Sequence, residues 1–181
     1  MRKVVKKVID ETVMKIYWEG FAPFVFPADP VALIGKIYAC DYRSYEQLAQ
    51  KNHLRSADIV RILKNPDGCV FYDRKKNHYM IAANEEGRSP ARIRWTIAHE
   101  IGHVVAGHFL EIDMDFLPEN KLMEEEADYF AASFLAPFFA IARKDFRRPA
   151  EIRDFFGLSQ TAAEYRWNEY VDFLRLVNSP L

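Results

Sequence analysis

The stretch RIRWTIAHEIGHVVAGH, residues 92–108, constrains the fold of this chain most, because it places ionisable side chains on an otherwise apolar helix. Residues four apart on a helix lie side by side, so His99 and His103 can offer two ring nitrogens to one cation. Glu100 lies beside them, and a buried carboxylate without a partner is strongly unfavourable unless a cation is near. The pattern therefore predicts a helix built around a metal ion, rather than a pair of hydrogen-bonded core histidines.

The order His99-Glu100-x-x-His103 is the His-Glu-x-x-His arrangement of zinc hydrolases. In these sites the glutamate is not a ligand. It accepts a proton from zinc-bound water, and the resulting hydroxide attacks a peptide carbonyl. Zinc needs a third protein ligand as well and keeps its fourth position for water. Gly102, on the same helix, is expected to let a neighbouring segment approach the metal closely.

The third ligand is expected from MEEEADYFAASFLAP, residues 123–137. Glu124 and Asp128 are four apart and share one helical face. A carboxylate ligand followed one turn later by a carboxylate that orients a ligating imidazole is a recognised pair, which assigns these roles to Glu124 and Asp128. Without the upstream motif, a solvated acidic helix start would be the better interpretation of all these acids, and it remains our interpretation of Glu125.

His108 is not expected to be a ligand. The class of zinc peptidases with a third histidine ligand has glycine three residues and histidine six residues past the second ligand. Here Gly107 and His108 lie four and five residues past His103. If the helix continues, His108 also lies about 180° around it from His99. Helix capping or packing at the helix end is the expected role.

The rest of the chain predicts an α+β fold, mostly helical, with a small antiparallel sheet beside the His-Glu-x-x-His helix. Apolar residues recur at helical spacing over residues 4–17. Short helices are predicted over 31–39 and 44–65, with Ser44 and Ser56 as N-caps. Two strands, 69–73 and 78–84, form a hairpin around the polar tip 74–77. Ser89 is then expected to be the N-cap of helices that begin at Pro90 and continue to Val177.

Composition excludes several classes of protein. The chain has 25 Lys and Arg against 26 Asp and Glu, so its net charge of −1 gives no overall attraction to nucleic acid or anionic membranes. The sequence contains no run of about 18 apolar residues, the length that a membrane-spanning helix needs. The N-terminus lacks the apolar core expected of a signal peptide. Cys40 and Cys69 have no paired spacing, so two buried thiols and a cytoplasmic location are expected.

Together, RIRWTIAHEIGHVVAGH, the preceding HYMIAAN and the following EEEADYFAASFLAP resemble the ImmA/IrrE family of zinc metallopeptidases. The family pattern has an Arg-rich helix start, then Thr-x-Ala-His-Glu-x-Gly-His, and later Glu-x-x-Ala-Asn/Asp-x-Phe-Ala with a Leu-x-x-Pro-like ending. The resemblance extends from about Asp67 to Pro137 and is looser outside it. It implies a zincin-like domain, here residues 1–136, followed by a helical extension, 137–181, packed on the same domain.

The resemblance also implies roles for residues and a biological context. His99, His103 and Glu124 would bind one zinc ion, Glu100 would be the general base and Asp128 would hold a ligand histidine. Manganese is possible in the cell. Members are typically intracellular regulators of bacteria and mobile elements such as phages, and they cleave a helix-turn-helix repressor so that its genes are expressed. Some members are better known for binding their target.

A peptidase must hold its substrate extended, and an exposed strand edge does this by main-chain pairing. HYMIAAN is the candidate edge, with Asn84 near the cleft, although an ordinary hairpin strand that covers the core is equally compatible with its sequence. An oxyanion donor is needed as well. Arg94, His78, His108 or a tyrosine can serve, and spacing alone does not choose. Asn84 and Arg94 are thus the candidate substrate-binding residues.

The stretch EIRDFFGLSQTAAEYRWNEYV, residues 151–171, has the rhythm of a helix-turn-helix with Gln160, Arg166 and Asn168 exposed. Its many aromatic residues, however, leave little of the polar face that reads DNA. We expect a structural or repressor-docking role there, without direct DNA binding. Three functions therefore compete: a zinc endopeptidase that cleaves a repressor, which is favoured, a metal-stabilised module that binds it without cleavage, and a DNA-binding regulator.

Overall fold

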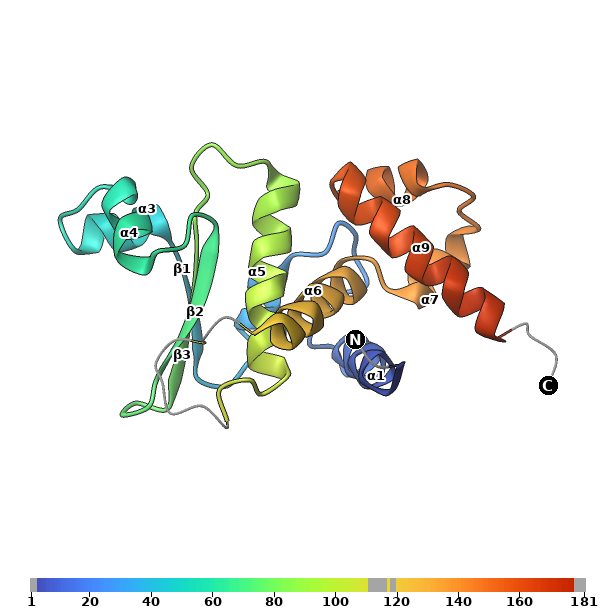
Figure 1. Cartoon of the computed structure of the whole chain (residues 1–181), viewed down its shortest axis with the longest axis horizontal. Coiled ribbons are helices and arrows are strands. Elements are labelled where there is room, and N and C mark those ends of the chain that lie inside the picture. The colour runs from blue at the N-terminus through green and yellow to red at the C-terminus, as the bar shows by residue number, and fades with distance from the viewer. Residues whose placement is uncertain (1–2, 111–116, 118–119, 178–181) are drawn as a thin grey trace.

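The computed structural model of this chain describes residues 3–110, 117 and 120–177, and it combines many helices with one small sheet (Figure 1). The predicted α+β class is confirmed. In chain order the elements are α1 (Lys3–Trp18), α2 (Pro30–Ile34), β1 (Cys40–Ser44), α3 (Tyr45–Lys51), α4 (Ser56–Leu63), β2 (Gly68–Asp73), β3 (His78–Ala83), α5 (Pro90–Val105), α6 (Lys121–Leu135), α7 (Phe138–Lys144), α8 (Pro149–Phe156) and α9 (Gln160–Val177).

The sheet has the strand order β1-β3-β2. β2 and β3 form the predicted antiparallel hairpin, in which Val70 lies opposite Ile81. β1 pairs with β3 in parallel, with Cys40 opposite Tyr79, so the sheet is mixed and the predicted antiparallel sheet is wrong in this respect. The sequence CDYRS of β1 is short and half polar, and its partner lies far along the chain, so no local pattern marks it as a strand.

This extra strand also corrects the predicted substrate edge. β3 lies between β1 and β2 and is paired along both sides, so it has no free main-chain edge. HYMIAAN is therefore a central strand, and the expectation that it holds a substrate by main-chain pairing is wrong. Within the described part of the chain, the free edges of the sheet belong to β1 and β2.

The two faces of the sheet are covered by different helices (Figure 1). Tyr45 and Ala49 of α3 and Ile59 of α4 pack with Ala82 on one face. On the other face, α5 packs against β2 and β3, and the main hydrophobic cluster includes Ile81. Because strand side chains alternate between faces, the single strand β3 contributes to both cores. α5 is thereby held between the sheet and α6.

Helix starts follow their capping residues at two of the three predicted positions. Ser44 caps α3 through a capping box with Gln47, and the hydroxyl of Ser89 accepts a hydrogen bond from the backbone N–H of Arg92 at the start of α5. Ser56 is not an N-cap, because it is the first residue of α4 and Arg55 occupies the cap position. The well-capped start of α5 sets where its histidines lie along the helix.

The C-terminal helices join the same core as α5 and α6. Ile152, Phe156 and Tyr170 belong to the main hydrophobic cluster together with residues of α5 and α6. Arg166 was expected to be exposed, but it is 0% exposed, and its Nε donates a hydrogen bond to the carbonyl of Ala136. It is buried because it lies on the inner face of α9, where aromatic rings cover its guanidinium. The boundary between residues 136 and 137 stays a prediction.

Two further expectations concern the cysteines and the membrane. Cys40 and Cys69 are both free thiols. Cys40 is buried, as predicted, whereas Cys69 is only half-buried. Burial raises the pKa of both thiols to about 12. None of the helices that the structure describes is long and apolar enough to cross a membrane.

Candidate metal centre

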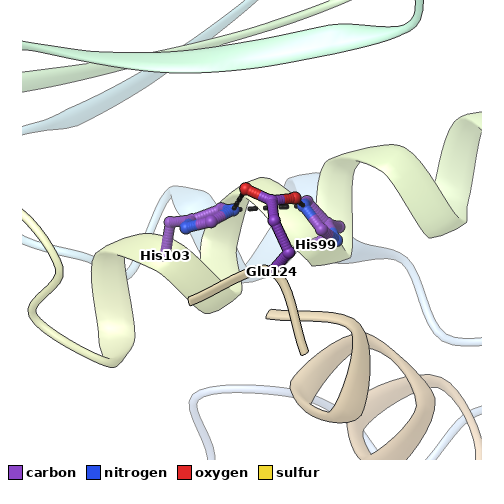
Figure 2. A group of neighbouring side chains, drawn as sticks. All are labelled: His99, His103 and Glu124. Carbon is purple, nitrogen blue, oxygen red and sulfur yellow. Dashed lines mark hydrogen bonds and ion pairs between the residues drawn. The ribbon is translucent and has the colours of Figure 1, made fainter. Parts of the chain in front are cut away.

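His99 and His103 of α5 and Glu124 of α6 point toward one another (Figure 2). The Nε2 atoms of the two histidines are 3.1 Å apart. Glu124 Oε2 lies 3.2 Å from Nε2 of His99, and Glu124 Oε1 lies 3.6 Å from Nε2 of His103. Helical spacing brings the two rings together, and the crossing of α5 and α6 supplies the carboxylate.

These three side chains fit a zinc ion. Bonds of about 2.0–2.2 Å to a tetrahedral ion place neighbouring ligand atoms about 3.3–3.6 Å apart, close to the three separations found here. Among the described residues, these three form the group of histidine, cysteine or acidic side chains that can hold a metal. A site with three protein ligands leaves a position for water or substrate, which is typical of catalytic rather than structural zinc sites.

The three converging side chains are buried on the side of His103 and exposed to solvent on the side of Glu124. The side chain of His103 is 4% exposed, whereas that of Glu124 is 51% exposed. A molecule in solution can therefore approach past Glu124 while the histidines stay shielded.

The second ring nitrogen of His99 is held by Asp128. Its Nδ1 lies 2.9 Å from Asp128 Oδ1, so Nε2 is directed toward His103 and Glu124. Burial lowers the pKa of His99, but hydrogen bonds to Asp128 and Glu124 outweigh it and raise that pKa to about 10. Burial and the charge of His99 lower the pKa of His103. Without a metal the site thus stabilises one positive charge as a proton on His99, and a cation must replace that proton.

Glu100 is 7% exposed and lies on the same helix beside this group. Burial, with a smaller contribution from the charge of Glu124, raises the pKa of its carboxyl to about 7, although His99 and a hydrogen bond with the backbone of Val70 act in the opposite direction. A carboxyl with a pKa near 7 can both accept and release a proton at neutral pH. Val70 lies on β2, so the carboxyl also sits next to an edge strand of the sheet.

His108 lies behind His103 and is not one of the three converging side chains. Its Nδ1 is 2.8 Å from Nδ1 of His103, and its Nε2 is 3.0 Å from Oε2 of Glu126. The predicted position of His108 holds for a continuous helix, but α5 ends at Val105 and the chain reverses at Gly107, whose φ is +72°. The glycine before His108 was a signal for this reversal. Nothing in the sequence singled out Glu126.

The two predicted substrate-binding residues make structural contacts away from the three converging side chains. The guanidinium of Arg94 donates a hydrogen bond to the carbonyl of Gly157, in the turn between α8 and α9. The side-chain amide of Asn84 donates to the carbonyl of Pro66 at 2.9 Å and so braces the loop after β3. Neither contact supports substrate binding, which stays a prediction for both residues.

Of the other oxyanion candidates, His78 pairs with Asp41 across β3 and β1, with 3.2 Å between Nε2 and Oδ2. Both ring nitrogens of His108 are engaged as described above. Tyr45 is fully buried on the face of the sheet that α3 and α4 cover, and its hydroxyl donates to the carbonyl of Asn65. Each of these three side chains thus makes a structural contact of its own, and a role as oxyanion donor stays a prediction.

A groove of about 770 Å³ begins at Asp128, which contacts His99, and runs between α5 and the start of α9. Its lining combines apolar and aromatic surface with polar groups, and includes Trp95, Asp128, Leu158, Ala162 and Tyr165. The groove is large enough for a side chain of a peptide. The C-terminal helices thus form one wall of a space that borders the candidate metal centre.

Comparisons with known proteins bear on this arrangement. The family model described as the IrrE N-terminal-like domain, of peptidase family M78, matches residues 57–168. Among solved structures, the chain is similar in fold to a Mycobacterium tuberculosis transcriptional regulator, with a TM-score of 0.54 and 13% sequence identity. The match covers 88% of this chain and 46% of that one, so this chain spans about half of the regulator's length. No curated protein matches the chain.

Proposed function

This chain belongs to the IrrE N-terminal-like domain family, and on that premise we propose that it is a zinc-dependent endopeptidase that cleaves a helix-turn-helix repressor. The observation that carries the proposal is the convergence of two histidines and a glutamate next to a second, buried glutamate. A binding module without catalysis needs no proton acceptor with a pKa near 7 beside its metal ligands. Glu100 is such a group.

In this proposal, His99, His103 and Glu124 bind the cation, and zinc, or manganese in the cell, fits the role. When bound, the cation supplies a Lewis acid that acidifies water and polarises a carbonyl. Glu100 accepts the proton of the attacking water and then delivers it to the leaving amine, as a carboxyl with a pKa near neutrality does efficiently. Asp128 keeps the ring of His99 in place during both steps.

β2 replaces β3 as the strand proposed to bind the substrate. It is an edge strand, and Val70 on it lies beside Glu100. An extended peptide that pairs with β2 would therefore pass the general base. Beyond that point, the groove at Asp128 offers Trp95 and Tyr165 to a substrate side chain.

The choice of a repressor as substrate rests on the resemblance of the motifs to the ImmA/IrrE family. A protein of similar fold is described as a transcriptional regulator, which supports a role in transcription control. Direct DNA binding is not part of the proposal, because Arg166, the basic side chain expected on the reading face, is buried. A mobility-shift assay at moderate salt should detect no specific binding by this chain to its own promoter region.

The decisive variant is Glu100→Gln, which keeps the shape of the side chain and removes its basicity. The probe is the repressor encoded beside this gene, incubated with zinc-loaded wild type or variant. Wild type should cleave it, whereas Glu100→Gln should leave it intact while retaining one zinc ion per chain. Unchanged derepression in cells that carry this variant would contradict the catalytic proposal and favour a binding module.

Metal content tests the ligand set separately. Glu124→Ala should lose bound zinc, because only two ligands remain, while Glu125→Ala should retain it. The two residues are neighbours on the first turns of α6, so the pair controls for general damage to that helix. Zinc loss in Glu125→Ala alone would mean that the wrong acid has been assigned.

A further inference from the structure

We propose that His108 and Glu126 form a hydrogen-bonded chain that positions His103 for metal binding, with one proton on each ring held at a defined nitrogen. The inference rests on the proposed function, because it takes Nε2 of His103 as a metal ligand. The chain runs from Glu126 Oε2 to His108 Nε2 over 3.0 Å, and from His108 Nδ1 to His103 Nδ1 over 2.8 Å.

The protons on this chain can be assigned from its geometry. A neutral imidazole carries one proton, so one nitrogen donates and the other accepts. Nε2 of His103 faces His99 and Glu124, and it must be unprotonated to bind a metal. The proton of His103 therefore lies on Nδ1 and is donated to Nδ1 of His108. His108 then carries its own proton on Nε2, which donates to the carboxylate of Glu126.

Because the rings of His103 and His108 are buried, losing a hydrogen bond between them would be unfavourable. The side chains of His103 and His108 are 4% and 5% exposed, so water cannot readily replace a lost partner. A buried donor without an acceptor is strongly unfavourable. Without His108, Nδ1–H of His103 would lose its acceptor, and the ring would be free to turn or to move its proton to Nε2, where the proton blocks the metal.

The two proposed ligand histidines are thus oriented by different hydrogen-bonding arrangements. His99 is held directly by a carboxylate of α6, Asp128, at the open side of the site. His103 is held through a second imidazole by Glu126, also of α6 but on the buried side. Both carboxylates come from α6, so the helix that supplies Glu124 also orients both of the imidazoles on α5.

The turn of the backbone after α5 makes the contact between His103 and His108 possible. Gly107 has φ +72°, a conformation that side chains other than glycine rarely adopt, and a Cβ there would lie 2.9 Å from Cδ1 of Leu110. The backbone N–H of His108 donates to the carbonyl of His103 at 3.2 Å, which brings the two rings together. The pairing of the rings thus depends on the backbone as well as on the side chains.

The test compares zinc affinity, measured by competition with a chromogenic chelator, across three variants. His108→Leu should weaken zinc binding about 10–100-fold, the usual effect of losing a residue that orients a ligand. His108→Gln, whose amide can both accept from His103 and donate to Glu126, should recover most of that loss. His78→Leu removes a histidine paired with Asp41 and should leave zinc affinity unchanged. Wild-type affinity in a folded His108→Leu protein would overturn the inference.

A second measurement does not depend on the folding of any variant. Nitrogen-15 NMR of zinc-loaded wild type distinguishes the two neutral forms of each ring, and His108 should carry its proton on Nε2. A proton on Nδ1 of His108 would overturn the inference. Failure of the proposed function looks different: zinc-loaded wild type would leave the repressor intact, wild type would bind no zinc, or Glu124→Ala would bind zinc as tightly as wild type does.

Discussion

Gly102 shows how a single missing side chain sets the distance between α5 and α6, the two helices of the candidate metal centre. A Cβ at this position would lie 2.9 Å from Cα of Ala127 and 3.1 Å from Cβ of Phe130, both closer than ordinary contact. The expectation that Gly102 admits a close neighbour is confirmed, and that neighbour is α6. Since Glu124 lies on α6, the position of this carboxylate depends on Gly102.

Gly102→Ala should therefore lower both stability and zinc affinity. Forcing a methyl group into a packed helix crossing costs about 1–3 kcal/mol in the free energy of unfolding, measured by urea denaturation. Displacement of Glu124 should weaken zinc binding in the same protein. Gly35→Ala is the matched control, because its Cβ would meet only the carbonyl of Ala32 at 3.7 Å. Zinc affinity unchanged in Gly102→Ala would show that the crossing does not position the ligand.

Glu100 makes the stability of the metal-free protein depend on pH. Its pKa is about 7 in the folded chain, above the ordinary value of 4.5, because burial disfavours the charged form. Between these two values the folded state holds a proton that the unfolded state releases. Stability therefore falls as pH rises through this window, and the full cost of the buried charge is present above pH 7.

Glu100→Gln removes this cost, so the metal-free variant should be more stable than metal-free wild type at pH 8. The gain follows from the size of the pKa shift and is on the order of 3 kcal/mol. At pH 4 the two proteins should unfold at similar urea concentrations, because both then carry a neutral side chain. Chelator-treated samples across pH 4–8 give the measurement, and an equal difference at every pH would contradict the assigned cause.

Residues of the candidate site were predictable where their positions depend only on neighbouring residues in the sequence. The neighbourhood of His99 and His103 depends only on helical spacing, and a well-capped helix provides it. The partner of His108 was not predictable, because it depends on the end of α5, on the reversal at Gly107 and on where α6 crosses. The burial of Arg166 likewise depends on which face of α9 meets α7, which no local pattern encodes.

At the scale of elements, Arg166 joins helices that are distant in the sequence. Its guanidinium stacks 3.7 Å from the centre of the Phe138 ring, and its Nη2 is 3.7 Å from Oδ1 of Asp10. Asp10 in turn accepts hydrogen bonds at 2.8 Å from the hydroxyls of Tyr129 and Ser133. These contacts connect α1, α6, α7 and α9 through one buried cation.

Arg166→Ala should cost about 3–5 kcal/mol in the free energy of unfolding, because it empties a packed site and leaves Asp10 without its cation. The control is Arg175→Ala on the same helix, whose ion pair with Asp172 is exposed on both sides and should contribute less than about 1 kcal/mol. Urea denaturation of the two variants provides the comparison. Equal effects would mean that burial of Arg166 does not make it a structural residue.

Elements were predictable where alternation or capping marks them, as in the β2–β3 hairpin and α5. β1 was missed because its five residues carry two charges and pair in parallel with a strand more than 30 residues away. Missing β1 also made the predicted mechanism wrong at one point. Because β1 pairs with β3, the strand expected to bind the substrate lies at the centre of the sheet. Long-range pairing thus decides which strand a substrate can reach.

At the scale of the whole molecule, the proposed metal site connects parts of the core that otherwise meet only by packing. His99 and His103 lie on α5, which packs on the sheet, and Glu124 lies on α6, which packs on α1 and α9. A cation bound by all three would couple the two sides. Because Ile152 and Tyr170 of the C-terminal helices belong to the same cluster, we expect them to unfold together with α5 and α6.

Metal removal should therefore lower the melting temperature of the entire chain. Free zinc at about 100 times its Kd stabilises the folded state by about 2.7 kcal/mol. For a chain of this size, that corresponds to about 5–11 °C. Scanning calorimetry of wild type with zinc and with excess chelator measures the shift, which should appear as one transition. In Glu124→Ala the chelator should have little effect, because the variant holds no zinc to lose. An equal chelator effect in both proteins would place the stabilising metal elsewhere, since the variant keeps every other group of the chain.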